Sequence, residues 1–135
     1  MRFLIIDDQI VFRKLMELFL AEYGTSDMAS DGYKGLTMVL KAIQNETNYD
    51  AIFLDIMMAG LEGHKVLQKI RELEKSENIS PPNQTKVIMV SAHEDSENIM
   101  GAFNSQADAY LVKPVMKEKL RAAMLKAGVI LPTQP

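Results

Sequence analysis

The sequence predicts an α/β fold in which a doubly wound parallel sheet of five strands is covered by five helices. Short apolar runs alternate along the chain with stretches in which apolar residues recur at helical spacing. Most of the runs are continuously apolar, which is the pattern of strands that are buried on both faces. Strands that alternate with helices form a parallel sheet with helices on both of its faces.

The five predicted strands coincide with the apolar runs of the sequence. The second strand is short and weak, whereas the others are rich in Ile, Leu, Val and Phe. The predicted ranges are Phe3–Ile6, Ser26–Ala29, Ala51–Leu54, Val87–Val90 and Ala109–Val112.

The five predicted helices each follow one of these strands. We expect the first helix to end at Gly24, the second to begin at Ser30–Gly32, and the fifth to end near Gly128. The apolar positions at helical spacing are Val11, Leu15, Leu18 and Phe19 in the first, Leu36, Val39, Leu40 and Ile43 in the second, Val66, Leu67, Ile70 and Leu73 in the third, Ile99, Met100 and Phe103 in the fourth, and Leu120 and Met124 in the fifth.

One connection is longer than is usual between a helix and a strand. Glu74–Lys86 contains the run Ser80–Asn83 and is predicted to be irregular. A surface insertion is favoured over a binding loop, and both interpretations stay open. The length of the chain corresponds to one domain, which we expect at residues 1–128, followed by a short C-terminal tail at residues 129–135.

Composition excludes several classes of protein. The chain has 135 residues, a net charge of −3 and no cysteine, so a disulfide framework and a thiolate metal site are excluded. No apolar run exceeds four residues, which is too short for a membrane span or the core of a signal peptide. The mild acidity provides no basic stripe for nucleic acid. We therefore expect a cytoplasmic protein that binds neither membranes nor nucleic acid.

Polar side chains follow four of the predicted strands at the point where each strand ends. Asp7 and Asp8 follow the first, Asp55 the third, Ser91 the fourth and Lys113 the fifth. The carboxyl ends of parallel strands share one edge of the sheet, where ligands bind. A single Asp after a strand is usually a helix N-cap, but that does not explain three acids, a hydroxyl and a lysine together. We expect these side chains to line one crevice.

The charges of these residues predict a cation in the crevice. Three carboxylates and one lysine leave two uncompensated negative charges, and close carboxylates do not all stay ionised without compensation. Magnesium suits such a site, because it binds one or two carboxylates together with waters and phosphate oxygens. A carboxylate beside magnesium can also attack phosphorus and form an aspartyl phosphate.

Taken in order, these motifs resemble the receiver domain of two-component response regulators, of the single-domain, chemotaxis CheY-like type. The resemblance covers residues 1–128 and implies a flavodoxin-like fold with the strand order 2-1-3-4-5. The matching segments are Ile5–Asp8, Ala29–Gly32, Leu54–Met58, Val90–Ala92 and Ala107–Pro114.

The resemblance implies a metal site and a phosphorylation site. Asp55 would accept a phosphoryl group from a phosphohistidine. Asp8 would bind Mg²⁺ or Mn²⁺ directly, Asp7 largely through water, and the backbone carbonyl of Met57 would be a further ligand. Met57 and His93 occupy positions that tune dephosphorylation in relatives.

The resemblance also implies a switch. Lys113, Ser91 and Ala92 would contact the phosphoryl group. Ser91 would move towards it and Tyr110 would turn inward behind it. Lys113–Pro114 would be a cis peptide. The surface that changes would be formed by the fourth helix, the fifth strand and the fifth helix.

The loop after the third predicted strand departs from the family pattern at two points. Ala59 stands where proline is frequent, and Glu62–Gly63 stands where the family usually has Asp-Gly. These changes bear on the flexibility of the loop and the lifetime of the phosphoryl group. The chemistry is still expected, because no charged residue of the site is missing.

Other functions fit the residues less well. The resemblance implies a signalling protein that catalyses its own phosphorylation and dephosphorylation rather than a dedicated enzyme. An aspartate-nucleophile phosphatase needs a second acid two residues after Asp55, where this chain has Met57. A flavin binder needs a small-residue loop after the first strand, where Asp7–Gln9 would repel a phosphate. A receiver without chemistry would lack the acids or the lysine.

The implied partners are a sensor histidine kinase or phosphotransfer domain and a downstream protein. The length leaves no room for an output domain, so we expect a stand-alone receiver. A flagellar motor switch protein is the leading candidate target. A phosphoryl carrier in a multistep phosphorelay and a docking subunit for a kinase are the alternatives.

Overall fold

The sheet has the predicted topology. The computed structural model describes residues 1–92 and 106–132. Its five strands pair in parallel in the order β2-β1-β3-β4-β5, which confirms the expected order. The strands are β1 (Arg2–Ile6), β2 (Thr25–Ala29), β3 (Ala51–Asp55), β4 (Lys86–Ala92) and β5 (Ala109–Lys113).

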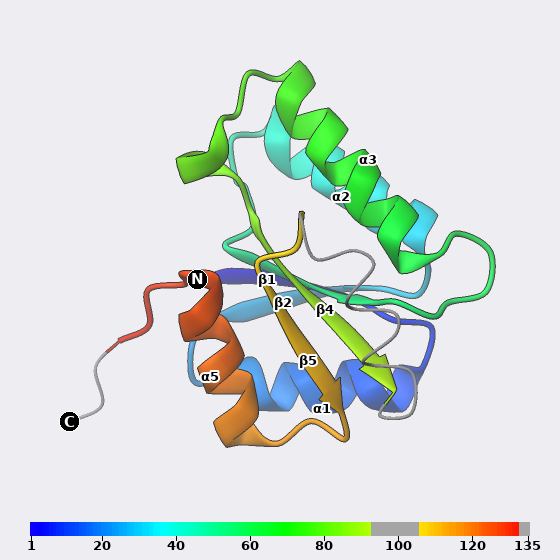
Figure 1. Cartoon of the computed structure of the whole chain (residues 1–135), viewed down its shortest axis with the longest axis vertical. Coiled ribbons are helices and arrows are strands. Elements are labelled where there is room, and N and C mark those ends of the chain that lie inside the picture. Colours follow the sequence, from blue (N-terminus) through cyan, green and yellow to red (C-terminus); the bar gives the residue numbers. More distant parts are fainter. Residues whose placement is uncertain (93–105, 133–135) are drawn as a thin grey trace.

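Helices cover both faces of the sheet. α1 and α5 lie on one face, and α2 and α3 lie on the other (Figure 1). The predicted fourth helix, with Ile99, Met100 and Phe103, falls within residues 93–105 and lies outside the described residues, so the described part of the chain contains four of the five predicted α-helices. These are α1 (Ile10–Leu20), α2 (Gly32–Gln44), α3 (Gly63–Ser76) and α5 (Lys117–Ala127).

Each face of the sheet has its own hydrophobic core. In β1, Phe3 and Ile5 pack into the core beneath α1 and α5, whereas Leu4 and Ile6 pack into the core beneath α2 and α3. This division follows from the alternation of side chains along a strand. It explains why β1, β3 and β4 are almost continuously apolar, because both faces of these strands are buried.

The predicted apolar face of α1 is wrong for Val11, Leu15 and Leu18, whereas Phe19 packs against the core as predicted. The helix packs Phe12, Met16 and Leu20 into the core, whereas Val11 is 78% exposed and Leu18 is 73% exposed. Both sets recur at helical spacing, since almost the whole helix is apolar, so periodicity alone does not select the buried one. The outcome is a row of apolar side chains on the solvent side of α1. The helix also ends at Leu20 rather than at Gly24.

The predicted irregular segment Glu74–Lys86 begins within a helix. α3 continues to Ser76, and a short 3-10 helix spans Pro81–Asn83. Glu74 is 1% exposed and receives a hydrogen bond from the backbone N–H of Thr85 (2.7 Å), which ties the end of the connection to α3. The segment is therefore anchored by a buried carboxylate, and the binding-loop interpretation receives no support from it.

Arg71 is the partner of that carboxylate. Its guanidinium contacts Glu74 (2.8 Å) and Asp108 (2.9 Å) and donates to the backbone carbonyls of Thr85 and Gln106. Asp108 in turn receives the backbone N–H of Val87 (2.8 Å). This network joins α3 to the beginnings of β4 and β5, at the edge of the sheet opposite Asp55.

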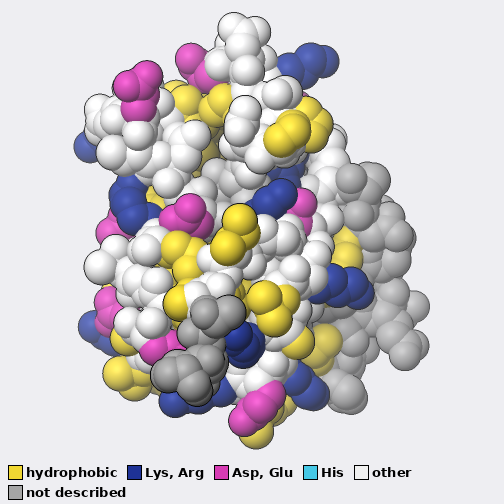
Figure 2. All heavy atoms as spheres, turned by 90° about the vertical axis from the view of Figure 1, so that its left-hand side faces the viewer, with side chains coloured by type: hydrophobic (Ala, Val, Ile, Leu, Met, Phe, Trp, Pro, Cys, Tyr) yellow, Lys and Arg dark blue, Asp and Glu magenta, His cyan; other side chains and the backbone are white. Residues whose placement is uncertain are grey.

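The C-terminal end of the described chain packs onto the domain. α5 ends at Ala127, next to Gly128 as predicted, and the φ of 94° at Gly128 suits glycine. Val129 is 6% exposed and joins the core beneath α5. On the face seen in Figure 2, hydrophobic side chains are interspersed with side chains of both charges. No helix among the described residues is long and apolar enough to span a membrane.

Candidate functional site

Three aspartates meet at the carboxyl edge of the sheet. Asp7 and Asp8 directly follow β1, and Asp55 ends β3, the neighbouring strand. Carboxylate oxygens of the three residues lie within 4.8 Å of one another. Asp7 is 0% exposed and Asp55 is 5% exposed, whereas Asp8 is open to solvent. The predicted convergence of these three acids is therefore present in the structure.

Lys113 joins the aspartates from the end of β5. Its Nζ lies 3.0 Å from Asp7 Oδ2 and 3.8 Å from Asp55 Oδ2. The same atom lies 4.3 Å from the centroid of the Phe12 ring, which forms a cation–π contact. Strand alternation brings these groups together, because Asp7, Asp55 and Lys113 continue the series of positions that face α1 and α5.

The electrostatics of the site disfavour a fully ionised state. Burial and, next, the neighbouring Asp7 carboxylate raise the pKa of Asp55 to about 7, although Lys113 and the backbone N–H of Met57 act in the opposite direction. One lysine does not balance two buried carboxylates and the exposed Asp8. A bound cation would supply the missing positive charge. Three carboxylates offer hard oxygen ligands, so the donor set fits Mg²⁺ or Mn²⁺.

Backbone groups hold the carboxylates in place. The N–H of Gln9 donates to Asp7 Oδ1 (2.8 Å), and the N–H of Met57 donates to Asp55 Oδ1 (3.2 Å). Arg13 donates from Nη1 to the backbone carbonyl of Asp7 (2.8 Å). Phe12 and Arg13 were not predicted to belong to the site, because Val11, Leu15, Leu18 and Phe19 were expected to form the buried face of α1.

Gly63 allows α3 to begin directly against the end of β3. A Cβ atom at this position would lie 2.2 Å from the backbone oxygen of Asp55 and 2.7 Å from the Cα of Ile56. The Gly63 N–H donates to the Ile56 carbonyl (2.9 Å), which closes the loop that follows Asp55. The sequence signal for this role was the Glu62–Gly63 pair itself, in which the glycine of the family pattern is kept.

Two hydroxyls lie on the other face of the sheet. Ser91 and Tyr110 continue the positions that face α2 and α3, and the register pairs Met89 with Tyr110 and Ser91 with Val112. They are therefore diagonal neighbours on adjacent strands. Neither hydroxyl oxygen has a hydrogen-bond partner among the described residues. Burial raises the pKa of Tyr110. Unsatisfied buried hydroxyls cost free energy and are ready to accept a new partner.

The remaining predicted positions surround the site. Met57 follows Asp55 with its side chain 56% exposed, and Ala92 ends β4 half-buried. The Lys113–Pro114 peptide bond is cis. His93 lies outside the described residues.

Comparison with known proteins agrees with this arrangement. The model of the response regulator receiver domain family matches residues 3–125. The chain is 28% identical over 134 residues to Regulatory protein VanRB of Enterococcus faecalis, which covers 96% of this chain and 54% of that protein. It is 32% identical over 114 residues to Transcriptional regulatory protein ResD of Bacillus subtilis, which covers 84% of this chain and 42% of that protein. The chain thus spans about half, or less, of the length of these relatives.

Solved structures lead to the same family. A response regulator receiver domain protein from Clostridium thermocellum has a TM-score of 0.72 at 29% identity, over 93% of this chain and 92% of that one. Chemotaxis protein CheY4 of Vibrio cholerae has a TM-score of 0.72 at 23% identity, over 96% of this chain and 98% of that one. The second likeness shows the fold alone. With the family model matching nearly the whole chain, this protein belongs to the response regulator receiver domain family.

Proposed function

We propose that this domain is a signalling switch that accepts a phosphoryl group on Asp55 from a phosphohistidine. The carrying observation is that the Asp55 carboxylate is buried beside Asp7 and 3.8 Å from the Lys113 ammonium. In the transfer, an Asp55 oxygen forms a bond to phosphorus while the bond between phosphorus and the imidazole nitrogen breaks, and the imidazole keeps the electron pair. Hydrolysis by water later restores the carboxylate.

The residues of the site have separate tasks in this proposal. Asp7, Asp8, Asp55 and the backbone carbonyl of Met57 would hold Mg²⁺ or Mn²⁺, which, when bound, offsets the negative charge of the phosphoryl oxygens. Lys113 would pair with those oxygens, and Ser91 and the Ala92 backbone would contact them from β4. Met57 and His93 would tune the rate of dephosphorylation.

The switch is proposed to run from Asp55 to Tyr110. The Ser91 hydroxyl has no hydrogen-bond partner among the described residues, and a phosphoryl group would supply one, so the phosphoryl group would favour one of two conformations. Tyr110 is a diagonal neighbour of Ser91 and also lacks a hydrogen-bond partner among the described residues, which makes it the residue that responds. The readout would be the surface of the fourth helix, β5 and α5.

The donor is expected to be a sensor histidine kinase or a phosphotransfer domain. A phosphohistidine reaches Asp55 only if its carrier docks beside the acids. α1 begins two residues after Asp8 and leaves Ile10, Val11 and Leu18 more than half exposed, so this apolar row suits the contact. We place the protein in the cytoplasm, where such donors act.

The output is proposed to leave by protein contact. A receiver at residues 1–128 with a tail at residues 129–135, acting on a flagellar motor switch protein, remains our leading prediction, with a phosphorelay carrier as the alternative. The region of Transcriptional regulatory protein ResD that is similar to this chain is part of a longer protein, and this lends no support to the motor target. Binding of the beryllofluoride form to a motor-switch peptide would separate these outputs.

Phosphorylation by acetyl phosphate tests the proposal. With Mg²⁺, the intact protein should gain the mass of one phosphoryl group, and Asp55→Asn should gain none. Asp50→Asn is the matched control, because Asp50 precedes the same strand at its opposite end. Removal of Mg²⁺ by a chelator should abolish labelling of the wild-type protein. Equal labelling of Asp55→Asn, or labelling that survives chelation, contradicts the proposal.

A further inference from the structure

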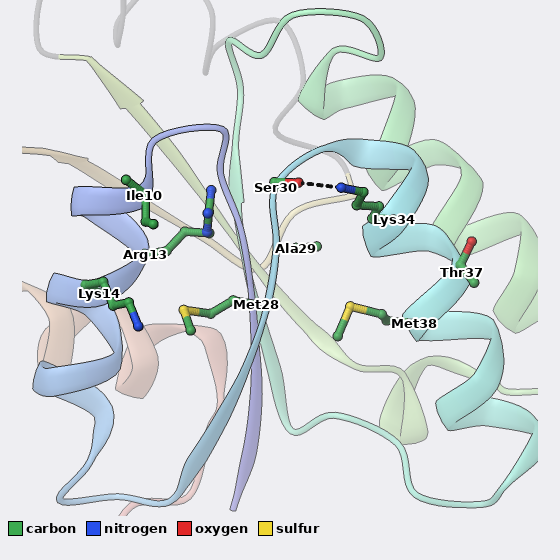
Figure 3. A pocket seen from close by; sticks show the side chains of 9 residues that line it. All are labelled: Ile10, Arg13, Lys14, Met28, Ala29, Ser30, Lys34, Thr37 and Met38. Atoms are coloured by element: carbon green, nitrogen blue, oxygen red, sulfur yellow. Dashed lines mark hydrogen bonds between the residues drawn. The ribbon is translucent and has the colours of Figure 1, made fainter.

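A concave site that does not include the three aspartates lies at the free edge of the sheet. This pocket of about 550 Å³ is formed where α1 and α2 flank β2, the edge strand (Figure 3). Its walls come from three elements that are far apart in the sequence. A volume of this order is typical of sites for small molecules, and it is too small for a folded partner.

The pocket is positively charged in a chain of net negative charge. Arg13 and Lys14 reach it from α1 and Lys34 from α2, and none of the described residues that line it is acidic. Among the described residues, no carboxylate lies within ion-pair distance of any of these three cations. Their positive charges therefore lack a partner in the described part of the protein, and a bound anion would provide one.

Two of the three cations are held at the pocket by the protein itself. Arg13 donates through Nη1 to the backbone carbonyl of Asp7 (2.8 Å), which orients the guanidinium and leaves its other donors free of described partners. Lys34 donates through Nζ to the Ser30 hydroxyl (3.1 Å), which follows β2. Figure 3 shows this bond and places Arg13 on the opposite side of the strand from Lys34. Oriented donors bind a charged head with less loss of conformational freedom.

The rest of the pocket is apolar. Met28 from β2 and Met38 from α2 are half-buried, and their thioether side chains flank the strand in Figure 3. Ile10, 60% exposed, extends the apolar wall at the start of α1. Methionine side chains adapt to ligands of different shape, because they are unbranched and polarisable. A purely inorganic anion would leave this apolar surface unused.

From these observations we infer that the pocket binds a small amphipathic organic anion. Its carboxylate, sulfonate or phosphate head would contact Arg13 and Lys34, and its apolar body would lie on Met28 and Met38. The inference goes beyond the proposed phosphoryl transfer, since it uses neither Asp55 nor a metal ion. The backbone of Asp7 connects the pocket to that site, because its carbonyl accepts from Arg13 (2.8 Å) and its N–H donates to the carbonyl of Ala29 (3.1 Å).

A pair of fluorescent probes tests the inference on the full chain. Anilinonaphthalene sulfonate carries an aromatic body and a sulfonate, whereas phenylnaphthylamine has the same body without the charge. We expect the sulfonate probe to bind and to shift the NMR signals of the Met28 and Met38 methyl groups. Arg13→Gln or Lys34→Gln should each weaken its binding about fivefold, as expected for the loss of one charge-assisted contact. The uncharged probe should respond to neither change.

Lys41→Gln is the matched control, since Lys41 is an exposed lysine of α2 that does not line the pocket, and it should leave binding unchanged. Lys34 is itself exposed, so Lys34→Gln keeps the test valid if the loss of the Arg13 contact to Asp7 unfolds the protein. The inference is overturned if the two probes bind equally well or if Lys34→Gln has no effect. It is also overturned if the shifts gather on Val11 and Leu18 instead of the two methionines.

Discussion

The Asp55 carboxyl is enclosed by the end of β3, the buried Asp7 carboxyl and the Lys113 ammonium. Such surroundings favour its neutral form, and burial together with Asp7 raises its pKa to about 7. At neutral pH the Asp55 carboxyl is therefore close to its pKa, so that both its protonated and its ionised form are present. A bound cation would favour the ionised form, which is the form that attacks phosphorus.

This raised pKa predicts how stability depends on pH. The folded state holds the Asp55 proton more tightly than the unfolded state. Without Mg²⁺, the contribution of this group to the free energy of unfolding is therefore fully present at pH values below its ordinary pKa of 3.8. That contribution is lost as the pH rises towards about 7. Asp55→Asn, which cannot ionise, should gain stability over the wild type across this range, by on the order of 2–4 kcal/mol at the upper end.

Urea unfolding of both proteins across this pH range, in the presence of a chelator, measures the difference. The difference in free energy of unfolding between Asp55→Asn and the wild type should increase with pH and then become constant. Mg²⁺ should reduce this difference, because it binds the folded wild type. A difference that does not change with pH, or an Asp55→Asn protein that is less stable than the wild type at neutral pH, would show that the pKa of Asp55 is not raised in the folded protein.

Among the elements, α3 is held by more than its apolar face. Arg71 forms ion pairs with Glu74 and Asp108 between α3 and the beginnings of β4 and β5. The two carboxylates accept the backbone N–H groups of Thr85 and Val87, and together these contacts form an anchor. Glu74 is almost fully buried, so its charge is compensated by Arg71 rather than by water. Removing one member of a buried pair leaves the other without its partner.

Replacement of Glu74 tests this anchor. Glu74→Ala should lower the free energy of unfolding by about 3 kcal/mol, because it leaves the Arg71 charge and the Thr85 N–H without their buried acceptor. Glu72→Ala, at an exposed position of the same helix, should cost no more than about 0.5 kcal/mol. Denaturant titration compares the two variants. Equal losses would mean that the anchor contributes nothing specific.

The elements also show how far the sequence alone could be read. Strands buried on both faces left continuous apolar runs, so their ranges were found within a residue or two. The same reasoning failed for α1, because two sets of apolar residues recur at helical spacing. One set is Phe12, Met16 and Leu20, and the other is Val11, Leu15 and Leu18. Which row is buried depends on the sheet beneath it. The contacts of Arg71 could not be predicted from the sequence for a related reason, since its partners come from three separate segments of the chain.

The candidate site was more predictable than α1. The carboxyl ends of parallel strands meet by geometry, so Asp7, Asp8, Asp55 and Lys113 were expected together and lie together. Arg13 and Gly63 were not assigned to it. The role of Arg13 depends on the phase of α1, which no local pattern encodes. The role of Gly63 depends on the approach of α3 to β3, for which the sequence offers the Glu62–Gly63 pair as a signal.

At the scale of the whole molecule, the acids and the two buried hydroxyls lie on opposite faces of the sheet. Asp55 and Lys113 belong to the positions that face α1 and α5, whereas Ser91 and Tyr110 belong to those that face α2 and α3. In the proposed switch, a signal from Asp55 would reach Tyr110 by crossing the sheet at its carboxyl edge. Lys113 ends β5, the strand that also carries Tyr110, so it is placed to pass on the presence of the phosphoryl group.

Lys113→Ala tests this coupling. The variant should still be labelled at Asp55, but beryllofluoride should no longer shift the NMR signals of the Tyr110 ring, because the phosphoryl analogue loses its contact to β5. Lys117→Ala, which removes a cation from the start of α5 instead, is the matched control and should keep the shift. A Tyr110 shift that persists in Lys113→Ala would remove Lys113 from the switch.

The most direct test of phosphoryl transfer to Asp55 is to locate the modified residue chemically. The protein is labelled with acetyl phosphate and Mg²⁺ and then reduced with borohydride, which converts an aspartyl phosphate into homoserine. Peptide mapping should find homoserine at position 55, and chelation of Mg²⁺ before labelling should prevent its formation. Homoserine at another aspartate, or none with Mg²⁺ present, would contradict the assignment of Asp55 as the phosphoryl acceptor.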